Sequence, residues 1–131
     1  MGPVMAQEAA AETILVVDGD VITRNVIAEY LRHCGFRVLE AGTGAEAMQA
    51  LQHAEFSIAI VLSDVELPGD MSGFDLAQWV RECMPQVKVL LAGAVGRIAD
   101  TAGDLCEEGP HLAKPYDHRL ILDNIKRLRA R

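Results

Sequence analysis

The chain has 131 residues, half of them hydrophobic, with a formal net charge of −7 and an isoelectric point near 5.0. This length fits one domain of ordinary size, and the acidic balance argues against a nucleic-acid-binding surface. No stretch is apolar over the length of a membrane span and no signal-type segment opens the chain, so we expect a cytoplasmic protein. Residues 1–12 are small and Ala-rich, which predicts a disordered tail before one domain over residues 13–131.

Three cysteines, Cys34, Cys83 and Cys106, are scattered along the chain without a CxxC pair. This pattern predicts free thiols in a reducing compartment. A dense basic run over residues 126–131 falls on a predicted helix. It is typical of a solvated last turn that complements the helix dipole, and a binding patch is the alternative.

Strand-like and helix-like segments alternate from residue 13 onward. A short apolar run over 13–17 predicts a buried strand, and helical spacing over 20–34 predicts a helix that Gly35 ends. A second strand is expected at 36–40. Thr43, with Glu46 three residues later, then predicts a capped helix whose apolar face holds Ala47, Met48 and Leu51.

The second half of the chain repeats this alternation. The run SIAIVLS, residues 57–63, is apolar through its middle, as in a parallel sheet covered on both faces. A loop then leads to a helix over 74–84 that Pro85 ends, followed by a strand over 87–92. Residues 93–109 have the least clear pattern and predict a loop with a short helix around 98–105. A short strand at 111–113 and an amphipathic helix at 116–130 complete the chain.

Five strand–helix units predict an α/β fold with a parallel sheet and helices on both faces. In such sheets the binding site lies beyond the carboxyl ends of the strands. We expect the following residues at that rim: Asp18 and Asp20 from the first strand, Asp64 from the third, Ala92 and Gly93 from the fourth, and Lys114 from the fifth.

Three carboxylates and one ammonium would therefore meet at one rim. Clustered carboxylates repel one another unless a cation lies among them, and hard oxygen ligands favour Mg²⁺. A carboxylate, Mg²⁺ and a lysine suit phosphoryl transfer, in which Asp64 could carry the phosphoryl group. The plainer interpretations are that Asp20 caps the first helix and that Lys114 is an ordinary loop lysine.

These motifs resemble the receiver domain of two-component response regulators over residues 12–130. The resemblance rests on ILVVDGD at the first strand, VLSDVELPGDMSGFDL around the third, VKVLLAG at the fourth and HLAKPY at the fifth. It implies a flavodoxin-like, doubly wound (βα)5 fold with a five-stranded parallel sheet in the order 2-1-3-4-5. It also implies a bacterial phosphoacceptor domain rather than an enzyme.

The resemblance assigns roles to particular residues. Asp64 corresponds to the phosphoacceptor and Lys114 to the lysine that contacts the phosphoryl group. Mg²⁺ would be held by Asp18, Asp64 and the backbone carbonyl of Glu66, with Asp20 as a further candidate. The switch positions that respond to phosphorylation correspond to Ala92, Gly93 and His111.

Two departures from the family pattern concern this site. Gly19 stands where the family has a second acid that binds Mg²⁺ directly, so Gly19→Asp is expected to tighten Mg²⁺ binding. Ala92 or Gly93 stands where the family has a Ser or Thr whose hydroxyl bonds the phosphoryl group. Such a charge-assisted hydrogen bond is worth roughly 1.5–3 kcal/mol. Its loss should weaken the coupling between phosphorylation and the change in shape.

Three functions remain in view. The first is a stand-alone receiver, a monomer or weak dimer, that takes phosphoryl from a histidine kinase or phosphotransfer protein and contacts an output protein, because the chain leaves no room for a DNA-binding domain. The second is an adaptor of the same fold that works without phosphorylation. The third is a haloacid-dehalogenase-like phosphatase with Asp18 as nucleophile and Asp20 as acid/base, which the absence of acids in AGAVG disfavours.

Overall fold

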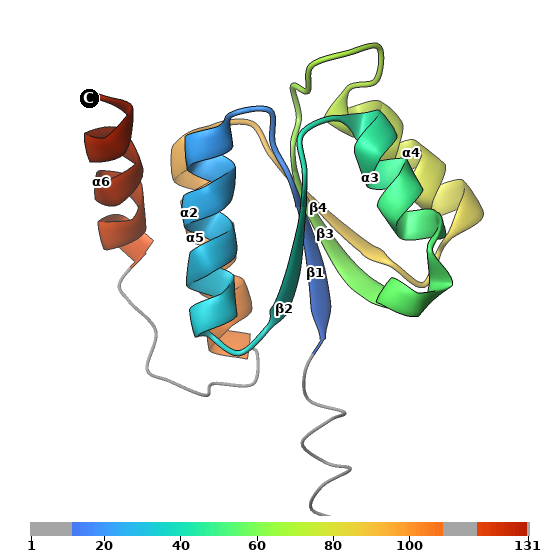
Figure 1. Ribbon diagram of the computed structural model, residues 1–131, viewed down its shortest axis with the longest axis horizontal. Helices are drawn as coiled ribbons and strands as arrows, with labels where there is room; N and C mark the ends of the chain where they lie inside the picture. Colours follow the sequence, from blue (N-terminus) through green and yellow to red (C-terminus); the bar gives the residue numbers. More distant parts are fainter. Residues whose placement is uncertain (1–11, 109–117, 131) are drawn as a thin grey trace, which may run out of the picture.

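The computed structural model describes residues 12–108 and 118–130. Within them, a parallel sheet lies between two sets of helices (Figure 1). The elements in chain order are β1 (Thr13–Val17), α2 (Val21–His33), β2 (Arg37–Ala41), α3 (Gly44–Gln52), a 3₁₀ turn (Ala54–Phe56), β3 (Ile58–Asp64), α4 (Gly73–Cys83), β4 (Lys88–Ala92), α5 (Val95–Glu108) and α6 (His118–Arg129).

The four strands in the described residues lie in the order β2-β1-β3-β4 and all pair in parallel, as the alternation predicted. The expected fifth strand at 111–113 lies outside the described residues. Side chains alternate along β1: Ile14 and Val16 join the core on one face of the sheet, and Leu15 and Val17 join the core on the other. This central strand is therefore buried on both sides, which explains why its sequence is continuously apolar.

Helices α3 and α4 cover one face of the sheet, and each begins with a side-chain cap. Thr43 Oγ1 accepts a hydrogen bond from the Glu46 N–H at 3.1 Å, as predicted. The Glu46 carboxylate, however, accepts from the N–H of Gly42 rather than from that of Thr43, so the return bond lies one residue earlier than in a capping box. A complete capping box opens α4, between Ser72 and Asp75.

Helices α2 and α5 cover the other face, and α6 lies outside them as a further layer (Figure 1). Helix α5 runs over 14 residues, so the predicted short helix around 98–105 was wrong in length. Its apolar positions Ile98, Ala102 and Leu105 pack into the core beneath α2. Gly96 and Gly103 lie inside this helix, and glycine is a weak helix former, so the sequence did not predict its full length. Helix α6 buries Ile121 and Ile125.

A disulfide joins Cys34 to Cys106, so the prediction of free thiols was wrong for these two residues. Cys34 caps the end of α2, where Gly35 adopts a positive φ of 105° and terminates the helix as predicted. The two cysteines are 72 residues apart, yet their Cα atoms lie 5.5 Å apart because α5 packs beside α2. Sequence spacing carries no information about this contact. Cys83 is a free, exposed cysteine.

Among the helices of residues 12–108 and 118–130, none has the length and apolar character required to cross a membrane.

Candidate functional site

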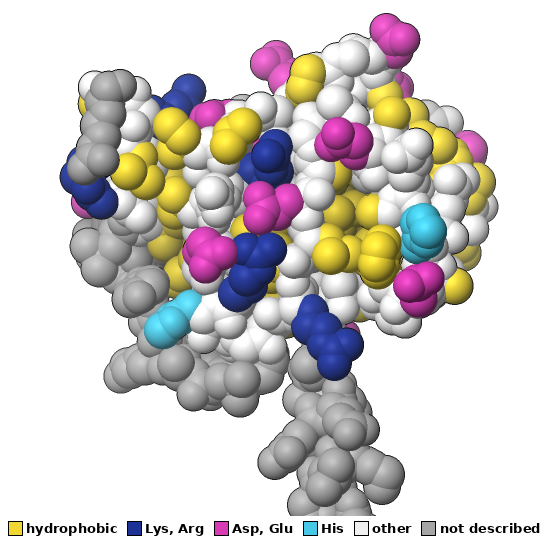
Figure 2. All heavy atoms as spheres, in the orientation of Figure 1, with side chains coloured by type: hydrophobic (Ala, Val, Ile, Leu, Met, Phe, Trp, Pro, Cys, Tyr) yellow, Lys and Arg dark blue, Asp and Glu magenta, His cyan; other side chains and the backbone are white. Residues whose placement is uncertain are grey.

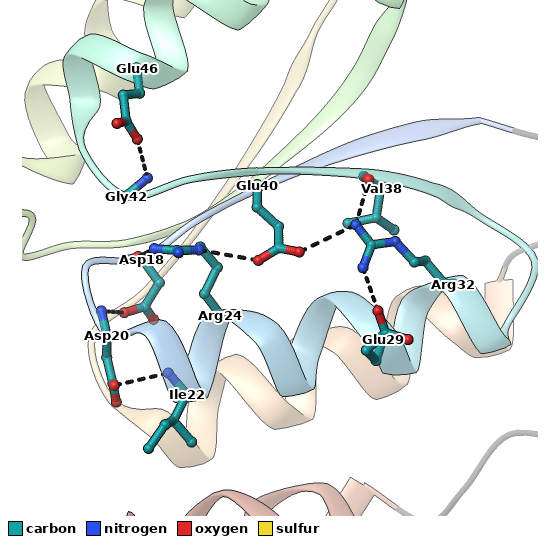
Figure 3. Close-up of polar contacts among 10 residues, drawn as sticks. All are labelled: Asp18, Asp20, Ile22, Arg24, Glu29, Arg32, Val38, Glu40, Gly42 and Glu46. Atoms are coloured by element: carbon teal, nitrogen blue, oxygen red, sulfur yellow. Dashed lines mark hydrogen bonds and ion pairs between the residues drawn. The ribbon is translucent and has the colours of Figure 1, made fainter.

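Asp18 follows β1 directly and is buried, with 3% of its surface exposed. Its backbone N–H continues the pairing with β2 by donating to the carbonyl of Ala41 at 3.1 Å. Its carboxylate accepts a hydrogen bond from the N–H of Asp20 at 2.9 Å, and its carbonyl accepts one from the Arg24 guanidinium at 2.9 Å (Figure 3). The strand end, a tight turn and a helix side chain thus hold Asp18 in place.

The pKa of Asp18 is raised from its ordinary value of 3.8 to about 6, mainly because burial disfavours the charged carboxylate. The hydrogen bond from Asp20 and the positive charge of Arg24 lower the pKa. The negative charges of Asp64 and Asp20 raise it. A buried acid with a perturbed pKa at the end of a central strand marks a candidate functional site.

Asp20 serves as the N-cap of α2, which confirms the plainer of its two interpretations. One carboxylate oxygen accepts from the N–H of Ile22 at 3.2 Å, and the other accepts from the Thr23 hydroxyl at 2.7 Å. That second oxygen also lies 3.2 Å from Nε of Arg129 at the end of α6. Figure 3 shows the Asp20 side chain turned toward Ile22. No group of three or more His, Cys, Asp or Glu positioned for a metal occurs within 12–108 and 118–130.

Asp64 is the last residue of β3, and its carboxylate accepts a hydrogen bond from the N–H of Glu66 at 3.2 Å. The start of α4 packs against its backbone. A Cβ added at Gly73 would lie 2.1 Å from the Asp64 carbonyl oxygen, so only glycine fits there. The Gly73 N–H also donates to the carbonyl of Val65 at 2.8 Å. This close approach fixes the backbone on which the Asp64 side chain stands.

The end of β4 carries no side-chain hydroxyl. Ala92 is buried and pairs with Asp64 in the sheet, while Gly93 is exposed. A Cβ at Gly93 would lie 3.3 Å from Cγ2 of Val65. The Val65 side chain therefore lies beside one of the two positions where the family has a Ser or Thr. The other two candidate residues, His111 and Lys114, lie outside the described residues, and their roles stay predictions.

Arg24 is a site residue that the sequence did not reveal. Besides its bond to the Asp18 carbonyl, it pairs with Glu40 of β2 at 3.2 Å. Glu40 also pairs with Arg32, which pairs with Glu29 and donates to the carbonyl of Val38. Figure 2 shows basic and acidic side chains alternating over α2 and β2. Arg32 and Arg24 are 8 and 16 residues from Glu40 in the sequence, so no local sequence motif indicates these pairs.

The donors present fit Mg²⁺. Asp18 and Asp64 provide two carboxylates at neighbouring strand ends, and the charge of Asp64 acts on Asp18. Proteins commonly hold Mg²⁺ through one or two carboxylates while water completes the octahedral shell. Asp20 is not among these Mg²⁺ donors in the structure. One of its carboxylate oxygens is bonded to Ile22, and the other is bonded to Thr23 and pairs with Arg129.

The fold and the site define a parallel α/β protein with an acidic rim at the carboxyl ends of its strands. The family model for the response regulator receiver domain matches residues 14–126, which is most of the chain. The chain therefore belongs to the response regulator receiver domain family.

Known relatives agree with this family. The transcriptional regulatory protein GltR of Pseudomonas aeruginosa is 35% identical over 128 residues, which cover 94% of this chain and 51% of GltR. The aerobic respiration control protein ArcA of Escherichia coli is 30% identical over 118 residues, which cover 90% of this chain and 48% of ArcA. The chain thus spans about half the length of the curated relatives it matches.

Two solved structures have a similar fold. A response regulator receiver domain protein from Clostridium thermocellum has 25% identity and a TM-score of 0.60, with 91% of this chain and 98% of that chain covered. A structure of the histidine kinase ThkA in complex with the response regulator protein TrrA has 30% identity and a TM-score of 0.58, with 63% of this chain and 69% of that chain covered.

Proposed function

We propose that this chain is a phosphoacceptor in a two-component phosphorelay, in which Asp64 accepts a phosphoryl group from a sensor histidine kinase or a phosphotransfer protein. The observation that carries the proposal is the pair of acids at the ends of β1 and β3. Asp64 ends β3, and its charge acts on the buried Asp18 at the end of the neighbouring β1. The family match and the likeness to a receiver crystallised with a histidine kinase support the same function.

In the proposed reaction, a carboxylate oxygen of Asp64 attacks the phosphorus of a phosphohistidine. The P–O bond forms, the P–N bond breaks and the electron pair returns to the imidazole nitrogen of the donor. Asp18, Asp64 and the backbone carbonyl of Glu66 would hold Mg²⁺, which neutralises charge on the phosphoryl oxygens when bound. Lys114 would contact the same oxygens, which is a role inferred from the family motif.

The rest of the proposal concerns the whole molecule. We place the domain at residues 13–131, with a fifth strand at 111–113 beside β4 to give the order 2-1-3-4-5, and a tail over 1–12. The domain would work in the bacterial cytoplasm as a monomer or weak dimer and would signal by protein contact, as a phosphoacceptor rather than an enzyme. GltR and ArcA are regulators about twice this length, so an output domain beyond this sequence is the alternative to a separate output protein.

A second function, a receiver-fold adaptor that works without phosphorylation, has its own support. The end of β4 offers Ala92 and Gly93 in place of a hydroxyl, and a glycine replaces one acid at the end of β1. The phosphatase hypothesis has less support, because the Asp20 carboxylate caps α2 and pairs with Arg129 instead of standing free as an acid/base.

Intact mass after incubation with a small-molecule phosphodonor and Mg²⁺ tests the proposal. We expect one added phosphoryl group in the wild type and none in Asp64→Asn. Glu66→Gln and Asp20→Asn are matched controls. Glu66 would contribute only its backbone carbonyl to the Mg²⁺ site, and the Asp20 side chain caps α2. Both should remain labelled. No added mass in the wild type, under conditions that label an ordinary receiver, would favour the adaptor.

A further inference from the structure

Two arginines of α2, Arg24 and Arg32, make the same kinds of contact with β2 and the backbone. Each pairs with one carboxylate oxygen of Glu40, at 3.2 Å for Arg24 and 3.3 Å for Arg32. Each also donates to a backbone carbonyl at 2.9 Å, but the carbonyls differ. Arg32 bonds Val38 inside β2, whereas Arg24 bonds Asp18, the acid that follows β1. Of these two contacts, the second reaches the acidic rim.

The Asp18 carbonyl lies just beyond the point where β1 stops pairing with β2. The last paired residues are Val17 and Ala41, and the Asp18 N–H then donates to the Ala41 carbonyl at 3.1 Å. After this bond the chain turns into α2, and the Arg24 guanidinium takes the place of a strand partner for the carbonyl. A charged donor makes a stronger hydrogen bond than a neutral N–H. Because Asp18 is buried, the loss of this donor would be costly.

The Arg24 guanidinium is itself held from more than one side. Figure 3 shows it between Asp18 and Glu40. A Cβ added at Gly42 would lie 3.1 Å from Nη1, so the turn after β2 packs against the same group. A planar guanidinium that bonds two partners at once holds both in a fixed geometry. The Asp18 carboxylate, which accepts from the Asp20 N–H, therefore stands on a backbone that two strands and a helix fix.

We propose that Arg24 is a positioning residue of the acidic rim, which holds the Asp18 backbone so that the carboxylates of Asp18 and Asp64 can bind one Mg²⁺ together. Arg32, which has the same pairing with Glu40, has no such role. The inference rests on the proposed function, because it concerns the Mg²⁺ site for phosphoryl transfer. Groups that orient a metal ligand affect metal affinity strongly, even though they do not touch the metal.

Charge and position make opposite predictions for Mg²⁺ binding. A guanidinium near the rim repels a cation, so removing its charge would by itself tighten Mg²⁺ binding. Removing the support of Asp18 weakens it. Arg24→Met keeps an unbranched side chain without the charge or the hydrogen bonds. Arg24→Lys keeps the charge on a group that cannot reproduce the planar fork.

The Mg²⁺ affinities of four proteins test the proposal: wild type, Arg24→Met, Arg24→Lys and Arg32→Met. Calorimetric titration without a phosphodonor, well below each unfolding temperature, compares folded proteins. We expect binding roughly tenfold weaker in Arg24→Met, an intermediate loss in Arg24→Lys and no change in Arg32→Met. Arg32→Met is the matched control, because it removes a pair with Glu40 from the same helix without touching Asp18. If Arg24→Met does not fold, Arg24→Lys decides the test.

A second measurement requires no metal. Hydrogen exchange of the Asp20 N–H, which donates to the Asp18 carboxylate, reports whether that carboxylate keeps its position. We expect faster exchange in both Arg24 variants and unchanged exchange in Arg32→Met. The Asp75 N–H, which donates to Ser72 at the start of α4, is the internal reference and should not change in any of them.

Several outcomes would overturn the proposal. One is equal Mg²⁺ affinity in the wild type and both Arg24 variants, and another is tighter binding in Arg24→Met. An equal loss in Arg24→Met and Arg32→Met would trace the effect to Glu40 instead of Asp18. Failure of the proposed function has a different result. Absence of label on Asp64 in a wild type that binds Mg²⁺ would contradict phosphoacceptance and leave the order of the Mg²⁺ affinities unaffected.

Discussion

The two faces of the sheet are held together in different ways. On the face of α3 and α4, the interactions that start each helix are local: Thr43 caps α3 and Ser72 caps α4, each bonding a residue three positions later. On the face of α2, α5 and α6, the links join distant parts of the chain. The Cys34–Cys106 disulfide, the Arg24–Glu40 pair and the Asp20–Arg129 pair span 72, 16 and 109 residues.

This difference predicts which substitutions will most affect stability on each face. A local cap costs little entropy to form and contributes little when present, whereas a covalent link between distant residues strongly restricts the unfolded chain. Stability on the α2, α5 and α6 face should therefore depend on the disulfide more than on any single polar contact.

Loss of the disulfide should have the largest effect. Replacing Cys34 and Cys106 with alanine opens a loop of 72 residues, for which chain entropy gives a cost of about 4 kcal/mol in the free energy of unfolding. Denaturant unfolding with and without a thiol reductant measures this cost, and Cys83→Ala is the control that should change little. Equal stability of the oxidised and reduced wild type would show that the link contributes nothing.

Asp18 lies at the end of β1, whose side chains enter the cores on both faces of the sheet. Its titration should have the next largest effect on the free energy of unfolding. Its pKa is raised from 3.8 to about 6 in the folded state, so the folded protein holds the proton more tightly than the unfolded chain. Stability should fall as pH rises through this window and then level off. Without divalent cations, Asp18→Asn should remove the fall and be more stable above the window by up to about 3 kcal/mol.

Unfolding measured across this pH range, in the presence of a chelator, tests the role of Asp18. Asp75→Asn is not a suitable control because Asp75 completes a capping box, so Asp70→Asn in the exposed loop serves instead. A wild-type stability that rises with pH through the window would contradict the raised pKa.

A smaller effect is expected on the α3 and α4 face. Ser72→Ala removes the side-chain acceptor for the Asp75 N–H and should cost about 1 kcal/mol. Thermal unfolding measures it, and Ser72→Asp, which restores an acceptor, should recover most of the loss. A loss well above that size would mean that Ser72 supports the site loop as well as the helix.

The smallest effect concerns the link between α6 and the acidic rim. The Arg129 and Asp20 side chains are 49% and 33% exposed, so their ion pair is weakened by solvent and salt. Arg129→Ala should change the free energy of unfolding by no more than about 1 kcal/mol, and less at high salt. Lys126→Ala on the same helix is the control. A large loss that persists at high salt would indicate that Arg129 positions α6 by packing.

Much of the fold could be predicted from the sequence because its signals are local. The apolar run before Asp18 identified β1, the spacing after Asp20 identified α2, and Thr43 and Gly35 marked helix ends through bonds within a few residues. The acids at the strand ends followed from the same reasoning, since parallel strands bring their carboxyl ends to one rim. The length of α5 was missed because Gly96 and Gly103, which are weak helix formers, lie inside it.

What only the tertiary structure decided involves residues far apart in the chain. The ion pair between Asp20 and Arg129 depends on α6 approaching the start of α2. The pairing of Cys34 with Cys106 depends on α5 lying beside α2. Local patterns specify which elements form, but these contacts depend on how the elements pack, and packing is a property of the whole chain.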